Sequence, residues 1–246
     1  MALPEIVSTE EWRAARIALL AEEKALTRAR DELSARRRRL PMVRVEADYR
    51  FTGPGGEEAT LLDLFDGHLQ LIVNHFMFDP EWTDGCPSCT AGADEMSDGL
   101  RAHLATRDTR LVYVSRAPIE KIEDYKARKG WTFPWYSSFG SRFNHDFHVT
   151  IDEAVTPAEY NYRSQAEWAE RDPSWAGWSG EQPGTSCFLR VGDEVFHTYS
   201  SFGRGAEWTG GSYAYLDLTA LGRQEDWEEP AGRSDSVRGN SPDFAS

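Results

Sequence analysis

One stretch of the sequence constrains the fold more than any other: an apolar run that ends shortly before a pair of cysteines. The run, Leu69–Phe78, has the length and composition of a buried strand. A short acidic loop follows, and then Cys86-Pro87-Ser88-Cys89. Apolar residues recur at intervals of three and four after this point, which predicts a helix with one core-facing side over Cys89, Ala93, Met96, Leu100 and Leu104.

A cysteine pair at the start of a helix has a defined chemistry. The free N–H groups and the positive dipole end of the helix lower the pKa of the first thiol, and the thiolate is the reactive form. We therefore expect Cys86 to be the exposed nucleophile and Cys89 the shielded resolving thiol. Pro87 suits the first helical turn, where its missing N–H costs nothing.

Two other interpretations of the cysteine pair remain open, namely half of a metal site and two inert core thiols. A structural zinc site usually needs four ligands. The third cysteine, Cys187, stands alone in the sequence and is most simply a buried apolar residue. We expect a redox-active dithiol with no metal and no cofactor.

Composition limits the kinds of partner. The 246 residues carry a formal net charge of −14, which argues against a general affinity for nucleic acid or anionic membranes. No apolar run is long enough to span a membrane, and the N-terminus lacks a signal-peptide pattern. Three cysteines do not make a secreted disulfide scaffold. These features predict a cytoplasmic protein.

The first organised segment, residues 8–39, has the pattern of one long amphipathic helix. Ser8 and Glu11 predict a capping box at its start, and basic residues at its end complement the dipole. The apolar positions recur every seven residues, at Trp12, Leu19, Leu26 and Leu33. A seam this narrow packs on the parent domain or pairs with a second chain, so a homodimer through this helix is one expectation.

The segment from residue 40 to 228 has the pattern of one α/β domain. After the cysteine helix, Leu111–Ser115 is a second buried-type strand, and Pro118 begins a helix that Gly130 ends. Strand, helix, strand and helix in this order imply a parallel crossover.

The last part of this domain combines irregular and regular patterns. The stretch of about residues 137–183 is too long for an ordinary loop and too aromatic for disorder, so we expect an ordered insertion over one end of the sheet. Residues 186–191 and 194–200 predict a hairpin with a Gly192-Asp193 turn. A last helix or helical turn is expected over Ser212–Leu221, and a disordered tail over residues 229–246.

Several stretches together carry a resemblance to a known family. The sequence resembles the DUF899 proteins over roughly Glu11 to Glu229, a bacterial family of thioredoxin-like fold described as predicted dithiol–disulfide oxidoreductases. The matching stretches are Leu26–Leu33, Leu40–Val43, Leu71–Phe78, Gly85–Cys89, Phe133–Ser138, Tyr160–Tyr162 and Glu194–Ser200.

The resemblance implies a thioredoxin-like fold in which Cys86 attacks a disulfide and Cys89 resolves it. A proline normally faces the cysteine pair just before the hairpin, and Pro183 is the proline nearest that position. The implied partner is a disulfide-containing or small-molecule redox substrate with an electron donor. Two alternatives are a non-catalytic binding or dimerisation protein of this fold and a thiol-dependent peroxidase, which would need a Thr and an Arg matched to its cysteine.

Other polar residues near the cysteines have two interpretations each. His75 could tune the thiolate or shuttle protons, but a hydrogen-bonded core histidine is the simpler expectation. His145, Asp146 and His148 have metal-ligand spacing, although an ordinary polar loop is the simpler expectation. The carboxylates Asp79, Glu81 and Asp84 would raise the pKa of Cys86 if they lay close to it.

Overall fold

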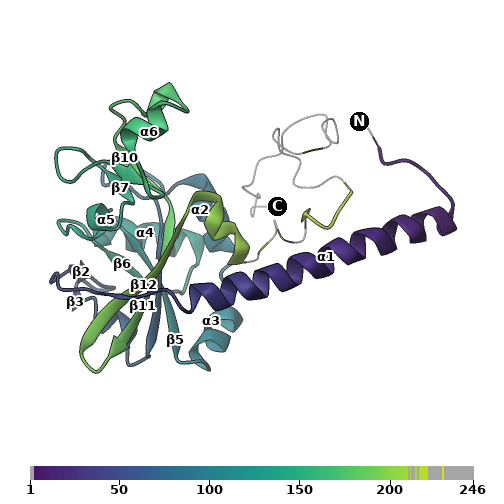
Figure 1. The fold of residues 1–246 in the computed structure, drawn as a ribbon. Helices are drawn as coiled ribbons and strands as arrows, with labels where there is room; N and C mark the ends of the chain where they lie inside the picture. The colour runs from purple at the N-terminus through teal and green to yellow at the C-terminus, as the bar shows by residue number, and fades with distance from the viewer. Residues whose placement is uncertain (1–2, 210, 212–213, 215, 221–228, 230–246) are drawn as a thin grey trace. The chain divides into compact units, whose positions relative to one another are not determined.

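The computed structural model describes residues 3–209, 211, 214, 216–220 and 229 (Figure 1). Among these residues, one compact unit contains the chain up to Pro41, and a second begins at Met42. Of the segment expected as a last helix, Ser212–Leu221, the structure describes residues 214 and 216–220, and residues 212, 213, 215 and 221 lie outside the described part. The expected tail over residues 229–246 lies outside the described residues apart from Glu229.

The first unit contains one long helix, α1 (Thr9–Arg37). The expected capping box is present, because the Glu11 N–H donates to Ser8 Oγ and the Ser8 N–H donates to the Glu11 carboxylate at 2.9 Å. No residue of α1 is buried within its own unit. The apolar seam of the helix is therefore uncovered in that unit.

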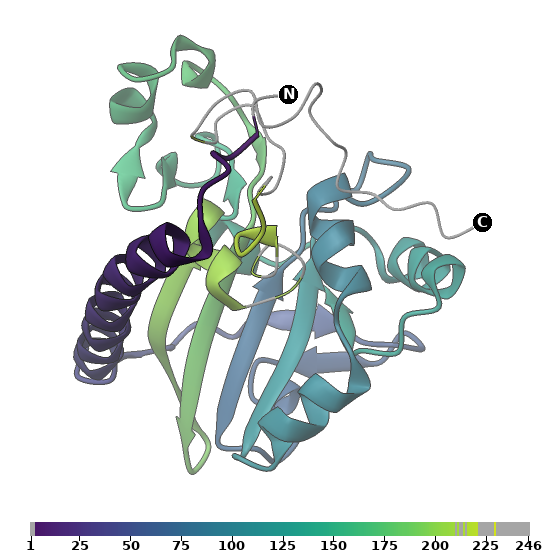
Figure 2. The ribbon, with the colours of Figure 1, turned by 90° about the vertical axis from the view of Figure 1, so that its right-hand side faces the viewer.

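The second unit is built on an eight-stranded mixed sheet of strand order β1-β12-β11-β4-β5-β6-β2-β3, whose central strands lie side by side in Figure 2. Strand β4 runs parallel to β5, and β5 runs parallel to β6. Strand β11 is antiparallel to both β4 and β12. The strands are β1 (Val43–Arg44), β2 (Arg50–Thr52), β3 (Glu58–Thr60), β4 (Gln70–His75), β5 (Thr109–Ser115), β6 (Trp135–Ser137), β11 (Gly184–Val191) and β12 (Glu194–Phe202).

Helices connect the parallel strands, as the sequence pattern predicts. The short 3-10 helix η1 (Asp63–Phe65) precedes β4, α2 (Pro87–Asp94) and α3 (Asp98–Ala105) join β4 to β5, and α4 (Ile119–Lys129) joins β5 to β6. A parallel strand–helix–strand unit followed by an antiparallel hairpin beside its first strand is the thioredoxin-like arrangement. The fold is thioredoxin-like, with a long N-terminal helix and an ordered insertion before the last hairpin.

The prediction of one continuous helix after the cysteines is wrong. Helix α2 ends at Asp94, and α3 begins after Ser97, whose hydroxyl accepts a hydrogen bond from the Leu100 N–H at 3.1 Å. Serine competes with the helical backbone for hydrogen bonds, so it favours a helix start over a helix interior. The periodicity continues across the break, which is why spacing alone did not reveal it.

The insertion has its own small core and lies at one end of the sheet. In Figures 1 and 2 it lies at the end where β4 leads to α2, opposite the β11–β12 turn. Its core contains Val149, Ile151, Tyr160 and Phe202, with three tryptophans packed against them. It comprises α5 (Phe143–Asp146), β7 (Thr150–Ile151), β8 (Glu159–Tyr160), β9 (Arg163–Ser164), α6 (Gln165–Ala169), η2 (Pro173–Trp175) and β10 (Gly180–Glu181).

The expected hairpin is present, and its first strand is longer than the pattern predicts. Strand β11 begins at Gly184, not at Ser186, so Pro183 directly precedes it. Gly184 pairs with His75 at the end of β4, and the chain turns at Gly192-Asp193 before β12. The 3-10 helix η3 (Gly203–Thr209) follows β12.

Apart from the small core of the insertion, two clusters of buried side chains make the core of the second unit. One contains Leu71, Val73, Phe143 and Phe188, together with aromatic and aliphatic residues of β2, β3 and η1. The other contains Phe76, Phe78, Tyr113 and Trp135 with α4 and α2, and Cys89 packs against it. Side chains alternate between the two faces of the sheet along β4. His75 therefore lies on the face of the first cluster, whereas Cys89 packs against the second cluster on the opposite face.

Candidate active site

Cys86 occupies the N-cap position of α2, and Pro87 is the first helical residue. The backbone N–H groups of Ser88 and Cys89 donate hydrogen bonds to the Cys86 sulfur. The backbone of Cys86 is fixed as well, because its N–H donates to the Met77 carbonyl at 3.0 Å and its carbonyl accepts from the Thr90 N–H at 2.9 Å. The sulfur therefore lies among donors that favour its anionic form.

These contacts lower the pKa of the Cys86 thiol to about 6. The largest cause is the hydrogen bond that the Cys89 thiol donates to the Cys86 sulfur, and the two backbone donors add to it. Burial opposes the shift, because desolvation disfavours a charged sulfur. At neutral pH Cys86 is mostly thiolate, which is the nucleophilic form.

Cys89 has the opposite character. Its pKa is raised well above the usual value, first because its thiol proton is shared with Cys86 and second because of burial. The side chain packs against the cluster that contains Phe76 and Ala93. One thiolate and one protonated thiol in contact make the arrangement that an attacking sulfur and a resolving sulfur require.

The acidic loop before the cysteines does not oppose the thiolate. The Asp79 carboxylate forms an ion pair with Arg116 at 2.5 Å, and the Asp84 carboxylate forms one with Arg128 at 2.7 Å. No carboxylate is among the causes that shift the Cys86 pKa. The conflict that the sequence raises is reduced because Arg116, directly after β5, and Arg128, in α4, pair with two of the loop's three carboxylates.

The structure places His75 on the side of the sheet away from the cysteine helix. Its Nε2 lies 2.8 Å from Ser186 Oγ, and its ring packs on Phe143 and Phe147. Burial and the nearby His197 lower the pKa of His75 to about 3, so the ring is neutral. No contact of the described residues joins His75 to the Cys86 sulfur.

Pro183 lies at the junction between the insertion and β11. Its carbonyl accepts a hydrogen bond from the Tyr160 hydroxyl at 2.9 Å, and the next residue pairs with the end of β4. This is the strand position that the thioredoxin resemblance assigns to the proline facing the cysteine pair.

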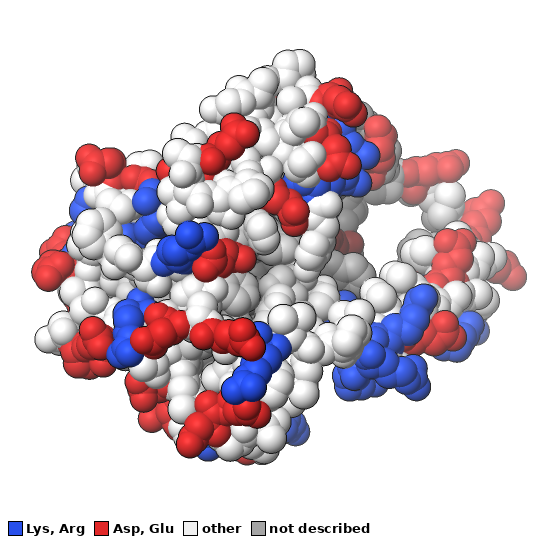
Figure 3. Space-filling model, turned by 60° about the vertical axis from the view of Figure 1, so that its left-hand side comes forward, with Lys and Arg blue, Asp and Glu red and all other residues white. Residues whose placement is uncertain are grey.

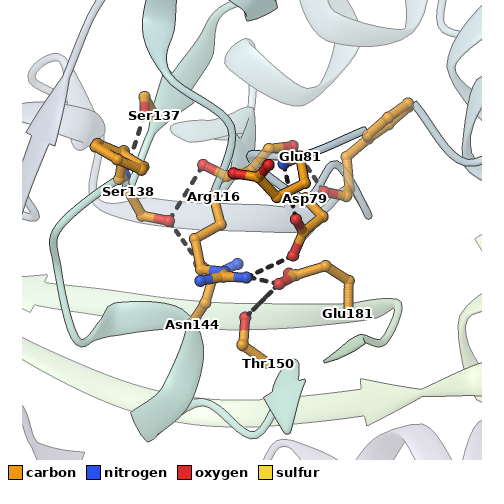
Figure 4. Close-up of polar contacts among 11 residues, drawn as sticks. Asp79, Glu81, Arg116, Ser137, Ser138, Asn144, Thr150 and Glu181 are labelled. Carbon is orange, nitrogen blue, oxygen red and sulfur yellow. Dashed lines mark hydrogen bonds and ion pairs between the residues drawn. The ribbon is translucent and has the colours of Figure 1, made fainter. Parts of the chain in front are cut away.

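A polar network that sequence reasoning missed lies at the same end of the sheet (Figure 4). The Arg116 guanidinium lies between Asp79 and Glu181, with Nε donating to Glu181 Oε1 at 2.7 Å. Thr150 donates to the other side of the Glu181 carboxylate at 2.9 Å. The Glu181 side chain is 1% exposed, and burial raises its pKa. The only sequence signal was an arginine directly after a buried strand.

A cavity of about 460 Å³ adjoins this network. It is bounded by the loop between β4 and α2 on one side and by β7 and β10 of the insertion on the other. Met77, whose backbone hydrogen-bonds to both cysteines, forms part of its wall. Met77 therefore connects the cavity wall to the segment that carries the dithiol.

The structure assembles no metal centre from the residues that it describes. No group of three or more His, Cys, Asp or Glu side chains in that part of the chain could hold an ion. His145 is buried, and its pKa is lowered by burial and by Arg116. His148 faces Glu159 at 4.0 Å. The two histidines therefore have different surroundings.

Charge is distributed without a dominant basic patch over most of the face drawn in Figure 3, where acidic and basic side chains are interspersed. Among the described helices, none combines the length and the apolar character needed to cross a membrane.

Solved structures with some similarity include a bacterioferritin comigratory protein from Xanthomonas campestris, studied for alkyl peroxide reduction. It is 15% identical at a TM-score of 0.42, with 66% of this chain and 87% of that chain covered. Xylella fastidiosa PrxQ is 15% identical at a TM-score of 0.43, with 69% and 90% covered. A putative protein disulfide isomerase from Bacteroides thetaiotaomicron is 18% identical at a TM-score of 0.29, with 40% and 60% covered.

Among curated proteins, none matches the chain. A family model does match, over residues 1–239, and that family is described as a bacterial protein of unknown function. The match spans nearly the whole sequence, including the cysteine pair, the insertion and the hairpin. The chain belongs to the DUF899 family.

Proposed function

We propose that this protein is a thiol–disulfide oxidoreductase that uses Cys86 as nucleophile and Cys89 as resolving thiol. The observation that carries the proposal is the pair's protonation pattern. Cys86, at the N-terminus of α2, has a pKa lowered to about 6, and its buried neighbour Cys89 has a raised pKa. Two inert core thiols would both stay protonated and would not show this difference in pKa.

The reaction proceeds by two exchanges. The Cys86 thiolate attacks one sulfur of a substrate disulfide, forms a mixed disulfide and releases the other half of the substrate as a thiolate. Cys89 loses its proton to that thiolate and attacks the Cys86 sulfur. The products are the Cys86–Cys89 disulfide and two substrate thiols, so the protein loses the two electrons that the substrate gains. A thiol or dithiol donor restores the reduced protein.

The insertion supports a particular substrate over general reduction of proteins. It lies at the end of the sheet where α2 begins, and it forms one wall of the cavity beside Met77. A cytoplasmic location suits the proposal, because that compartment keeps accessible dithiols reduced.

The peroxidase alternative has a weaker basis in the geometry. A peroxidatic thiolate needs an arginine at the sulfur, but the hydrogen bonds that lower the Cys86 pKa come from Cys89 and from backbone N–H groups. Arg116 is bound by two carboxylates instead. We therefore rank disulfide exchange above peroxide reduction.

The test is a redox titration of the full chain. Native protein is equilibrated across a thiol–disulfide series, alkylated and read as intact mass. We expect a reversible two-electron transition that Cys86→Ser abolishes and Cys187→Ser leaves in place. Two thiols that stay unreactive until the protein unfolds would contradict the proposal and favour a non-catalytic role. Consumption of peroxide with a thiol donor, in place of disulfide, would favour the peroxidase.

A further inference from the structure

We propose that the cavity beside Met77 binds a positively charged group of the substrate, so that the preferred substrate is a disulfide carrying a cation such as a primary amine. This inference rests on the proposed function and adds the class of substrate. It follows from the position of the cavity, from its charge and from its aromatic walls.

The position comes from Met77. Its carbonyl accepts the Cys86 N–H at 3.0 Å, its backbone also hydrogen-bonds to the Cys89 thiol, and the residue lines the cavity. A group bound in the cavity is thus held beside the dithiol. Neither cysteine lines the cavity, so a disulfide joined to that group by a short chain would extend past Met77 toward the Cys86 sulfur.

The cavity wall has a net negative charge whether Glu181 is ionised or protonated. Among its lining residues, three carboxyl groups, Asp79, Asp152 and Glu181, face one cation, Arg116. Protonation of Glu181 would still leave two carboxylates against one guanidinium. A negative wall in a partly desolvated cavity attracts a cation and repels an anion.

The one cation in the cavity wall, Arg116, is already paired with two carboxylates. Its Nη2 donates to Asp79 at 2.5 Å and its Nε donates to Glu181 at 2.7 Å (Figure 4). Lys121 also reaches this loop, but its ammonium donates to the carbonyls of Pro80 and Trp82 and does not line the cavity.

Asp152 is the carboxylate with the most freedom to meet a ligand. Its Oδ1 accepts the Ala154 N–H at 3.0 Å, and in the described part of the chain it forms no ion pair. Trp82 and Trp178 add two aromatic walls, and Trp82 is 37% exposed. An indole face beside a carboxylate is a favourable environment for an ammonium or guanidinium group.

The experiment compares three symmetrical disulfides of similar length in single turnovers with the reduced full chain. They are cystamine, which is cationic, 2-hydroxyethyl disulfide, which is neutral, and 3,3′-dithiodipropionate, which is anionic. Each rate is divided by the rate of the same disulfide with dithiothreitol, which removes intrinsic reactivity. We expect the normalised rates to fall in that order, with about tenfold or more between the first and the last.

Matched variants separate the cavity from the overall negative charge of the protein. Asp152→Asn keeps the Oδ1 acceptor and removes one charge, and we expect it to reduce the cystamine preference about threefold. Asp193→Asn removes the same charge at the β11–β12 turn, at the other end of β11, and should leave the preference unchanged.

The outcomes distinguish the two proposals. Oxidation by all three disulfides at equal normalised rates, or equal effects of the two variants, overturns the cation site and leaves the oxidoreductase standing. Failure of all three to oxidise the dithiol, together with no transition in the redox titration, overturns the proposed function itself.

Discussion

Gly85 lies against the ring of Phe76 so closely that a β-carbon at residue 85 would lie 2.7 Å from Cζ of that ring. Phe76 is 1% exposed, and its carbonyl accepts a hydrogen bond from Ser115 Oγ at 2.6 Å, so the ring cannot easily move. Because Gly85 has no side chain, the backbone directly before Cys86 can pack against the buried ring of Phe76.

Gly85→Ala is therefore expected to destabilise the protein by about 1–3 kcal/mol, because the added methyl group overlaps a fixed ring. Gly92→Ala is the control. It lies inside α2 with nothing within 4 Å of its would-be β-carbon, so it should raise stability by about 0.5–1 kcal/mol. Urea denaturation measures both. Equal changes in the free energy of unfolding for the two substitutions would refute the close packing of Gly85 on Phe76.

The reactivity of Cys86 should depend on pH through its lowered pKa. We expect the alkylation rate of the reduced protein to rise with pH through a midpoint of about 6, since the thiolate fraction rises there. Cys89→Ala removes the thiol donor and should move the midpoint upward by about one pH unit or more. Cys89→Ser keeps a hydroxyl donor and should move it less. Identical midpoints in all three proteins would contradict the assigned cause.

Arg116→Ala is expected to destabilise the protein by about 3 kcal/mol at neutral pH, because it leaves the buried Glu181 carboxylate without its partner. The pKa of Glu181 is already raised in the folded protein, so the folded state binds the proton more tightly than the unfolded state. Glu181 therefore lowers the free energy of unfolding more as the pH rises and less as the pH falls. The loss in the variant should be smaller at pH about 4.5 than at pH about 7.

The comparison that checks this prediction is the double variant Arg116→Ala with Glu181→Gln, followed by urea denaturation at both pH values. It should recover part of the lost stability at neutral pH and none of it at the lower pH. A pH-independent loss in the single variant would show that Glu181 is not the group that the arginine stabilises.

Ser186→Ala should lower stability without changing Cys86. Ser186 Oγ lies 2.8 Å from both His75 Nε2 and Ser200 Oγ, and the substitution leaves these buried groups without their shared partner. We expect a loss of about 1–3 kcal/mol. The alkylation midpoint of Cys86 should stay where it is, because His75 faces the other side of the sheet. A shifted midpoint would instead support the hypothesis that His75 tunes the thiolate.

The seam of α1 predicts a homodimer, and sedimentation of the full chain tests it. Leu26→Glu places a charge on the seam and should favour the monomer. Ala25→Glu makes the same change in charge off the seam and should leave the association unchanged. A chain that is monomeric before any substitution would contradict this expectation.

Local patterns were enough to predict the framework of the site. The apolar run that became β4, the cysteine pair at the N-terminus of α2, the capping box of α1 and the Gly192-Asp193 turn all depend on residues within a few positions of one another. Hydrogen bonding and burial at these places follow from short-range geometry, which a sequence displays directly.

Only the tertiary structure decided how distant groups affect the cysteines. The sequence places Asp79 seven positions before Cys86 and leaves its effect on the thiol open, but Arg116, directly after β5, forms an ion pair with it. Glu181 joins that pair from the insertion, and the cavity beside Met77 exists because these segments meet. Electrostatic coupling depends on distance in space, and no periodicity in the chain encodes which charges become neighbours.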